Sequence, residues 1–193
     1  MLSDFITIQD VFENPDEIVR FAKSQKYDSK ETHYHNVNGK SQFEGKRSQS
    51  IGDIDKQFSE KMNHQIYSKI FLERFPQGFG RIQYKYHFKI SSYFHIVSEE
   101  NEYSDNWKHY DDTSLMAGVV YLNKDTQEDC GTVIYKQNGE VDQIVKNEYN
   151  KLVLYSSTHM QSAQRGFGTN VDDSRLTLNI FIKQMNIECF TEE

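Results

Sequence analysis

The 193-residue chain has few of the residues that would indicate a cross-linked or multidomain protein. It contains two cysteines, Cys130 and Cys189, without the C-x-x-C spacing of a zinc or redox motif, so reduced thiols are expected. It also contains only two prolines, no proline-rich or glycine-rich linker and no internal repeat. We therefore expect one domain spanning residues 1–193.

Long apolar runs and excess positive charge are also lacking. No run reaches the roughly 18 residues of a membrane-spanning helix, and residues 1–10 lack the basic start and apolar core of a secretory signal. A cytoplasmic protein without membrane association is therefore expected. The 22 Lys and Arg against 29 Asp and Glu give a net charge of −7, which disfavours a nucleic acid as partner. The oligomeric state is not indicated.

Alanine is scarce, with three residues, whereas aromatic residues are abundant, with 12 Tyr and 13 Phe. This balance favours strands over helices. Two helices are still predicted. The first begins with Asn14 as cap and Pro15 at its first position and ends near Tyr27, and the second covers Ile54–Phe75. The polar stretch Ser29–Ser50 between them is predicted to be a loop, with at most a short strand, and is a candidate lid or substrate wall.

The pattern changes to a period of two residues after Gly80. Ile82–Ile90 alternates apolar and polar residues, as a strand with one solvated face does. Further strands are predicted at Tyr93–Val97, Leu115–Leu122, Thr132–Tyr135, Lys151–Tyr155 and Leu176–Lys183. The sequence therefore predicts an α+β, mainly β fold of the jelly-roll type. Residues 1–80 would be mainly helical support and loop, and residues 81–185 the β core.

A candidate metal site begins at His109, just before the predicted strand Leu115–Leu122. His109 and Asp111 are two residues apart, so on extended backbone both side chains point to one face and can reach one ion. A facial triad of two histidines and one carboxylate needs a second imidazole, and His159, just past the strand Lys151–Tyr155, is the candidate. Such a triad leaves three positions open on an octahedral Fe(II).

A candidate anion-binding residue follows sixteen positions after His159. Leu176, Leu178, Ile180 and Ile182 share one face of the last predicted strand, whereas Arg175, Thr177 and Asn179 share the other. An arginine on the polar face of an otherwise apolar strand suits a buried carboxylate, which a guanidinium binds through two parallel hydrogen bonds. Arg165 is a rival for this role, but its neighbours Gly166 and Gly168 favour an exposed loop.

Together these residues resemble the Fe(II)- and 2-oxoglutarate-dependent oxygenases. The stretch 109–123, HYDDTSLMAGVVYLN, followed by CGTVIY at 130–135, is similar to the prolyl 4-hydroxylase-like branch, with Cys130 in place of the first glycine of its usual turn. The resemblance covers about residues 82–183. It implies a double-stranded β-helix, a cupin-like jelly roll, with the N-terminal helices packed on one sheet.

The resemblance also implies roles for individual residues. His109, Asp111 and His159 would be the catalytic iron ligands, and Arg175 would hold the distal carboxylate of 2-oxoglutarate. Tyr121 and Thr177 match cosubstrate-binding positions of the family; a second cosubstrate tyrosine is not identified. The implied activity is hydroxylation of a C–H bond with Fe(II), 2-oxoglutarate and O2, and ascorbate is a further candidate cofactor.

Several alternatives stay open. The substrate would be a peptide or protein side chain, as in prolyl hydroxylases, or a small molecule, while oxidative demethylation of nucleic acid ranks third. The contrasting class is a non-catalytic jelly roll that binds a ligand or a protein. A rival metal site at His33–His35 is disfavoured because no glutamate follows at the cupin spacing.

Overall fold

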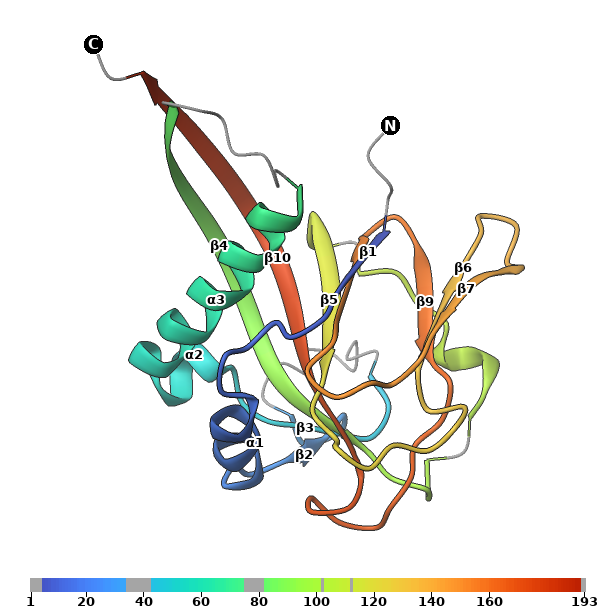
Figure 1. Ribbon diagram of the computed structural model, residues 1–193. Helices are drawn as coiled ribbons and strands as arrows, with labels where there is room; N and C mark the ends of the chain where they lie inside the picture. The colour runs from blue at the N-terminus through green and yellow to red at the C-terminus, as the bar shows by residue number, and fades with distance from the viewer. Residues whose placement is uncertain (1–4, 34–42, 75–81, 102, 112, 192–193) are drawn as a thin grey trace.

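The computed structural model describes residues 5–33, 43–74, 82–101, 103–111 and 113–191 (Figure 1). Within them, ten strands form two antiparallel sheets. The larger sheet has the order β1-β8-β5-β10-β4-β3-β2, and the smaller has the order β7-β6-β9. In chain order the strands are β1 Phe5–Ile8, β2 Asp28–Ser29, β3 Lys46–Arg47, β4 Ile82–Val97, β5 Met116–Tyr121, β6 Thr132–Tyr135, β7 Val141–Val145, β8 Leu152–Ser156, β9 Met160–Ala163 and β10 Arg175–Thr191. The predicted mainly β architecture is confirmed, and its closure into a double-stranded β-helix stays a prediction.

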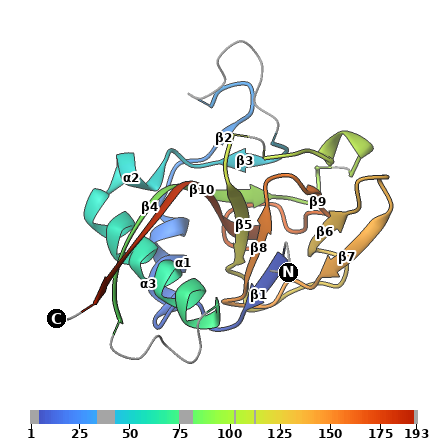
Figure 2. The same ribbon diagram turned by 90° about the horizontal axis from the view of Figure 1, so that it is seen from above.

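In the described part of the chain, three α-helices cover one face of the larger sheet, and the smaller sheet lies on the opposite side (Figures 1 and 2). They are α1 Pro15–Lys23, α2 Ile51–Ile54 and α3 Lys56–Arg74, and a short 3-10 helix follows β4 at Asp105–Trp107. Their apolar side chains form one core with the sheet; its fully buried members include Ala22, Ile51, Met62, Ile66, Phe94, Val120, Leu154, Leu178 and Ile180. The helices therefore cover one face of the larger sheet, and its other face is available for a second core and the candidate site.

The strands of the larger sheet alternate between the two faces. On β10, Leu176, Leu178, Ile180 and Ile182 belong to the core beneath the helices, as the sequence pattern predicted. A second core lies on the face toward the smaller sheet; its buried members are Ala117, Val119, Tyr121, Ile134, Val145, Val153 and Tyr155. Polar side chains of β10 point into this space between the sheets, where the candidate site lies.

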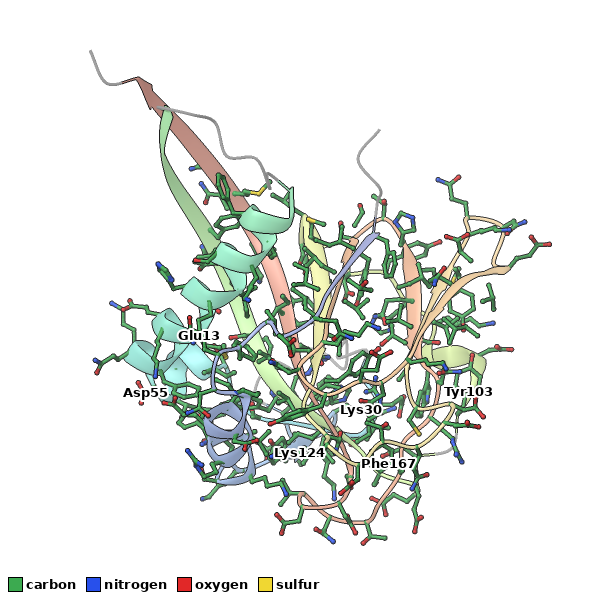
Figure 3. The ribbon with its side chains drawn as sticks, viewed as in Figure 1. Glu13, Lys30, Asp55, Tyr103, Lys124 and Phe167 are labelled. Atoms are coloured by element: carbon green, nitrogen blue, oxygen red, sulfur yellow. The ribbon has the colours of Figure 1, made fainter. Side chains whose placement is uncertain are left out.

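The helices differ from the prediction at their ends. Pro15 does begin α1, but Asn14 makes no side-chain capping hydrogen bond and the helix ends at Lys23 instead of near Tyr27. The predicted helix Ile54–Phe75 corresponds to α3, Lys56–Arg74, which begins two residues later because the backbone at Asp55 is extended, with φ −149° and ψ 102°. The four-residue helix α2 before it was not predicted. Asp55 (Figure 3) accepts a hydrogen bond from the backbone N–H of Phe58 at 2.9 Å, which is the local interaction that favours a new helix start.

The strands are longer and more numerous than predicted. Ile82–Ile90 and Tyr93–Val97 are one strand, because the intervening serines pair with β10 like their neighbours. The alternation in the sequence does not mark β1, β7 or β9. Ser29–Ser50 contributes the short strand β3 and one residue of β2; residues 34–42, with His35, lie outside the described residues. No helix in the described part of the chain is long and apolar enough to cross a membrane.

Candidate active site

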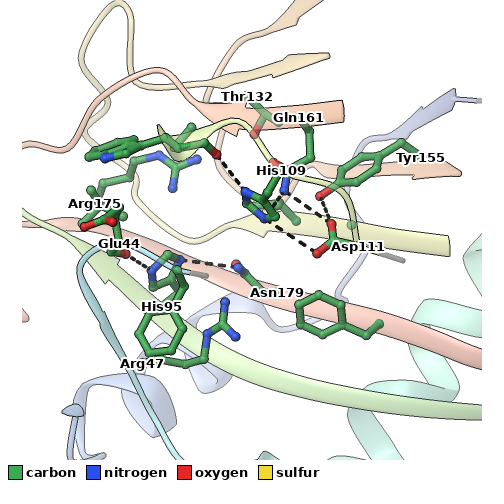
Figure 4. Close-up of a pocket in the computed structure, with 17 residues that line it drawn as sticks. Glu44, Arg47, His95, His109, Asp111, Thr132, Tyr155, Gln161, Arg175 and Asn179 are labelled. Carbon is green, nitrogen blue, oxygen red and sulfur yellow. Dashed lines mark hydrogen bonds and ion pairs between the residues drawn. The ribbon is translucent and has the colours of Figure 1, made fainter. Parts of the chain in front are cut away.

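A pocket lies between the two sheets and collects polar side chains from most of the strands around it (Figure 4). The loop after the 3-10 helix contributes His109 and Asp111, and β9 contributes Gln161. Arg175 and Asn179 come from β10. The remaining lining residues include Arg47, His95, Trp107, Thr132 and Tyr155.

The orientation of His109 is fixed by the backbone. Its Nδ1 lies 2.7 Å from the carbonyl oxygen of Trp107, so Nδ1 carries a proton and donates it to that oxygen. In the neutral imidazole, the other ring nitrogen, Nε2, carries no proton and presents its lone pair to the pocket. A neutral imidazole held by a backbone carbonyl in this way is the usual state of a metal-binding histidine.

The carboxylate of Asp111 lies beside that lone pair, with Oδ1 3.7 Å from His109 Nε2. Its Oδ2 accepts a hydrogen bond of 3.3 Å from the hydroxyl of Tyr155. Burial raises the pKa of the Asp111 carboxyl, and the neighbouring imidazole of His109, the Tyr155 hydroxyl and the guanidinium of Arg47 oppose part of that rise. The structure thus brings His109 and Asp111 together at one end of the pocket.

The third member of this group is Gln161 and not His159. Gln161 Nε2 lies 2.7 Å from His109 Nε2 and 3.3 Å from Asp111 Oδ2, and the residue is 7% exposed. His159 does not line the pocket; it lies in the bend before β9, and its buried Nδ1 has no hydrogen-bond partner. Across the described residues, no group of three His, Cys, Asp or Glu side chains could hold a metal ion. The structure therefore does not bring the three predicted ligands to one point.

Arg175 lies at another part of the same pocket, 2% exposed. Its Nε donates to the carbonyl oxygen of Cys130 at 2.8 Å, and its Nη2 donates to that of Gly131 at 3.2 Å. Burial lowers the pKa of the guanidinium. No carboxylate of the described residues forms an ion pair with it. A buried cation with N–H groups to spare is suited to binding an anionic ligand.

Tyr121 and Thr177, the other predicted cosubstrate residues, lie near Arg175 but are not among the residues that line the pocket. Tyr121 is fully buried; its ring centre is 5.7 Å from the guanidinium, and its hydroxyl donates to Thr132 Oγ1 at 2.7 Å. Thr177 donates to Asn179 Oδ1 at 2.8 Å. Near Arg175, Thr132 and Asn179 line the pocket, whereas Tyr121 and Thr177 form hydrogen bonds to these two residues from outside the lining.

The overall structure resembles those of several oxygenases. A prolyl-4-hydroxylase from Pseudomonas putida matches 94% of this chain and 92% of its own, with a TM-score of 0.52 and 13% identity. A 2OG-Fe(II) oxygenase family oxidoreductase from Burkholderia pseudomallei matches 94% and 85%, with a TM-score of 0.56 and 9% identity. A prolyl hydroxylase from Trichoplax adhaerens, in complex with a hypoxia inducible factor peptide fragment, matches 94% and 84%, with a TM-score of 0.54 and 15% identity.

The chain has the fold of prolyl 4-hydroxylase-like oxygenases. The resemblance stated from the sequence is therefore confirmed for the fold. No protein-family model and no curated protein matches the sequence. At identities of 9–15% the likeness establishes the fold alone, so the role of each residue is argued from the pocket itself.

Arg47 and His95 line the pocket but were not assigned to it from the sequence, which placed Arg47 in a basic cluster on a solvated surface. Arg47 lies against the rings of Phe43, Tyr93 and Phe181, at 4.2, 5.4 and 5.8 Å from the ring centres, and burial lowers its pKa to about 10. His95 is buried beside it; burial, and next the charge of Arg47, hold its pKa well below the usual value. Arg47 and His95 are paired across β3 and β4, a contact between residues 48 positions apart that no local pattern reveals.

Proposed function

We propose that the chain is an Fe(II)- and 2-oxoglutarate-dependent dioxygenase that hydroxylates a C–H bond. The observation that carries the proposal is the arrangement of one pocket. An unprotonated imidazole nitrogen and a carboxylate lie side by side, at His109 and Asp111, and the same pocket contains the buried guanidinium of Arg175. The fold shared with oxygenase structures supports the proposal but does not carry it alone.

The donor set suits the metal and the cosubstrate that this fold family uses. Imidazole and carboxylate are ligands of Fe(II). The ionised carboxyl of Asp111 carries a buried negative charge, which a bound metal ion would compensate. When bound, iron and 2-oxoglutarate would supply the oxidising chemistry, with O2 as oxidant and succinate and carbon dioxide as products. Arg175 would hold the distal carboxylate of the cosubstrate. Its five N–H groups exceed the two that it donates to the backbone.

Thr132 fits the same role beside Arg175. Its side-chain oxygen already accepts the hydrogen of Tyr121, so its own hydroxyl hydrogen is available to a ligand in the pocket. Thr132 is 1% exposed, which keeps that hydrogen bond away from bulk water. Two donors of different kinds would thus orient one carboxylate, with Tyr121 holding Thr132 in position.

A peptide or protein side chain is the substrate class that we favour, with a small molecule as the alternative. The Trichoplax adhaerens prolyl hydroxylase, which shares the fold, was solved with a peptide. Arg47 gives the pocket a second guanidinium, and its Nε is buried without a hydrogen-bond partner. A substrate that offers an oxygen atom to this group would satisfy it.

A non-catalytic ligand-binding module is the second candidate, and one observation favours it. In the structure, the side-chain amide of Gln161 contacts both His109 and Asp111, and two imidazoles and a carboxylate do not gather there. A pocket of this kind could bind an anion through Arg175 without performing oxidation. Turnover of 2-oxoglutarate distinguishes the dioxygenase from the non-catalytic module.

The test is conversion of 2-oxoglutarate to succinate by the purified chain supplied with Fe(II) and O2, measured with and without added peptide. We expect slow uncoupled conversion in the wild type and its loss in His109→Ala. Arg165→Lys is the matched control, because Arg165 is exposed and donates to the backbone of Glu128 outside the pocket. Failure of the wild type both to bind Fe(II) and to convert 2-oxoglutarate would leave only the binding module.

A further inference from the structure

The backbone holds Gln161 directly opposite His109. The two residues form an isolated antiparallel bridge, in which each N–H donates to the other's carbonyl oxygen at 3.0 Å. Side chains of such a directly opposed pair lie on the same face with Cβ atoms about 5 Å apart. The position of the Gln161 side chain beside the imidazole is therefore set by two backbone hydrogen bonds, independently of its own contacts.

The position of His159 is set differently. Its backbone N–H donates to the carbonyl oxygen of Ser156 at 3.0 Å, which closes the turn between β8 and β9. β9 begins one residue later, at Met160, and the β9 residues that line the pocket are Gln161 and Ala163. His159 therefore lies on the turn, outside the alternation that points side chains of β9 into the pocket.

The three side chains that do meet have the dimensions of a facial set of ligands. Atoms bound about 2.1 Å from one octahedral ion at right angles lie about 3 Å apart. The observed separations are 2.7 Å between His109 Nε2 and Gln161 Nε2 and 3.3 Å between Gln161 Nε2 and Asp111 Oδ2. The other oxygen of the carboxylate, Asp111 Oδ1, lies 3.7 Å from His109 Nε2. The amide oxygen and nitrogen of glutamine have nearly the same shape, so a half-turn of the amide places Oε1 where Nε2 lies.

We propose that Gln161, through its amide oxygen, is the third metal ligand of this site, in place of an imidazole. This inference rests on the proposed function and adds a specific ligand set of His109, Asp111 and Gln161. Without a metal, the amide N–H groups satisfy the imidazole lone pair and the carboxylate. With a metal, the oxygen side turns inward. The free site is thus held together by hydrogen bonds that the ion replaces.

The neutral oxygen changes what the site binds. Imidazole suits Fe and other late first-row metals, whereas carbonyl oxygen is a harder ligand that suits Mn and Mg. Exchange of the amide for an imidazole should therefore strengthen binding of Co(II) more than binding of Mn(II). Exchange for a carboxylate should strengthen binding of both ions, because it adds a negative charge at nearly the same size.

The experiment is a metal titration of the purified full chain with Co(II) and with Mn(II), by calorimetry and by the fluorescence of Trp107, the only tryptophan, which lines the pocket. We expect Gln161→Ala to raise the Kd at least tenfold and Gln161→His to lower it for Co(II). His159→Ala should leave it within twofold. Gln161→Glu provides a folded variant with the opposite expected effect if the alanine variant proves unstable.

The outcomes separate the two proposals. If the wild type binds neither ion and His109→Ala changes nothing, the proposed function fails. If the wild type binds, His109→Ala abolishes binding and Gln161→Ala, Gln161→His and Gln161→Glu all leave the Kd unchanged, the third ligand is not Gln161 and the function stands. Loss of binding in His159→Ala, with Gln161→Ala unaffected, would return the site to the triad expected from the sequence.

Discussion

Replacement of Arg175 by lysine tests the part of the pocket that is proposed to bind the carboxylate of 2-oxoglutarate. The guanidinium has five N–H donors, and the carbonyl groups of Cys130 and Gly131 accept two of them, which leaves at most three for the hydroxyl of Tyr121 and a ligand. Lysine has three donors in all, so one remains once both carbonyls are satisfied. Loss of at least one charge-assisted hydrogen bond, worth about 1.5–3 kcal/mol, predicts roughly 10- to 150-fold weaker binding of 2-oxoglutarate.

Binding can be followed by the fluorescence of Trp107 as 2-oxoglutarate is added to the metal-loaded protein, with calorimetry as the independent method. The matched control is Arg165→Lys, which should leave the Kd unchanged because Arg165 is exposed and outside the pocket. Thermal unfolding of both variants checks that each is folded. An unchanged Kd in a folded Arg175→Lys protein, or an equal loss in the control, would refute the assignment of this end to the carboxylate.

Three further predictions concern stability and ligand positioning. Leu154→Ala should lower the free energy of unfolding, measured by urea denaturation, by about 2–5 kcal/mol, because Leu154 is fully buried. Leu115 is 53% exposed, so Leu115→Ala should change the free energy of unfolding by less than about 0.5 kcal/mol. Equal effects would contradict the core assignment. Tyr155→Phe removes the hydroxyl bound to Asp111 and should weaken metal binding about tenfold or more, and an unchanged Kd would show that the hydroxyl does not orient the carboxylate. Backbone N–H groups lower the pKa of Asp173, so the carboxylate stabilises the fold above its unfolded pKa of about 4, and this stabilisation is lost as the pH falls through the folded pKa. Asp173→Asn should therefore reduce the fall of Tm at acid pH. An unaltered fall of Tm would contradict this.

The sequence predicts the fold wherever one local pattern decides the structure. The alternation at Leu176–Ile182 specified both faces of β10, and Thr132–Tyr135 is a strand with the predicted bounds. Patterns fail where a single residue or a distant partner decides. The four-residue helix α2, which the extended backbone at Asp55 separates from α3, has no periodic pattern in the sequence. β3, only two residues long, exists because it pairs with β4, far along the chain.

The candidate site shows the same division. The i, i+2 spacing was enough to bring His109 and Asp111 together, and the polar face of β10 was enough to direct Arg175 into the pocket. The residue beside them on β9 could not be predicted, because a search for imidazole passes over glutamine. The length of the turn after β8 also decides which of residues 159–161 faces inward. A search for any oxygen or nitrogen donor near His159 would have included Gln161.

The two faces of the larger sheet separate the residues that stabilise the fold from those that line the pocket. Strands β4, β5, β8 and β10 give some residues to the core beneath the helices and others to the pocket, so an exchange on the pocket side leaves the packing behind the sheet untouched. A pocket residue could thus be exchanged for another donor while the scaffold is retained. Such freedom is consistent with a shared architecture at 9–15% identity, and it makes the pocket side of β10 a natural position for directed evolution.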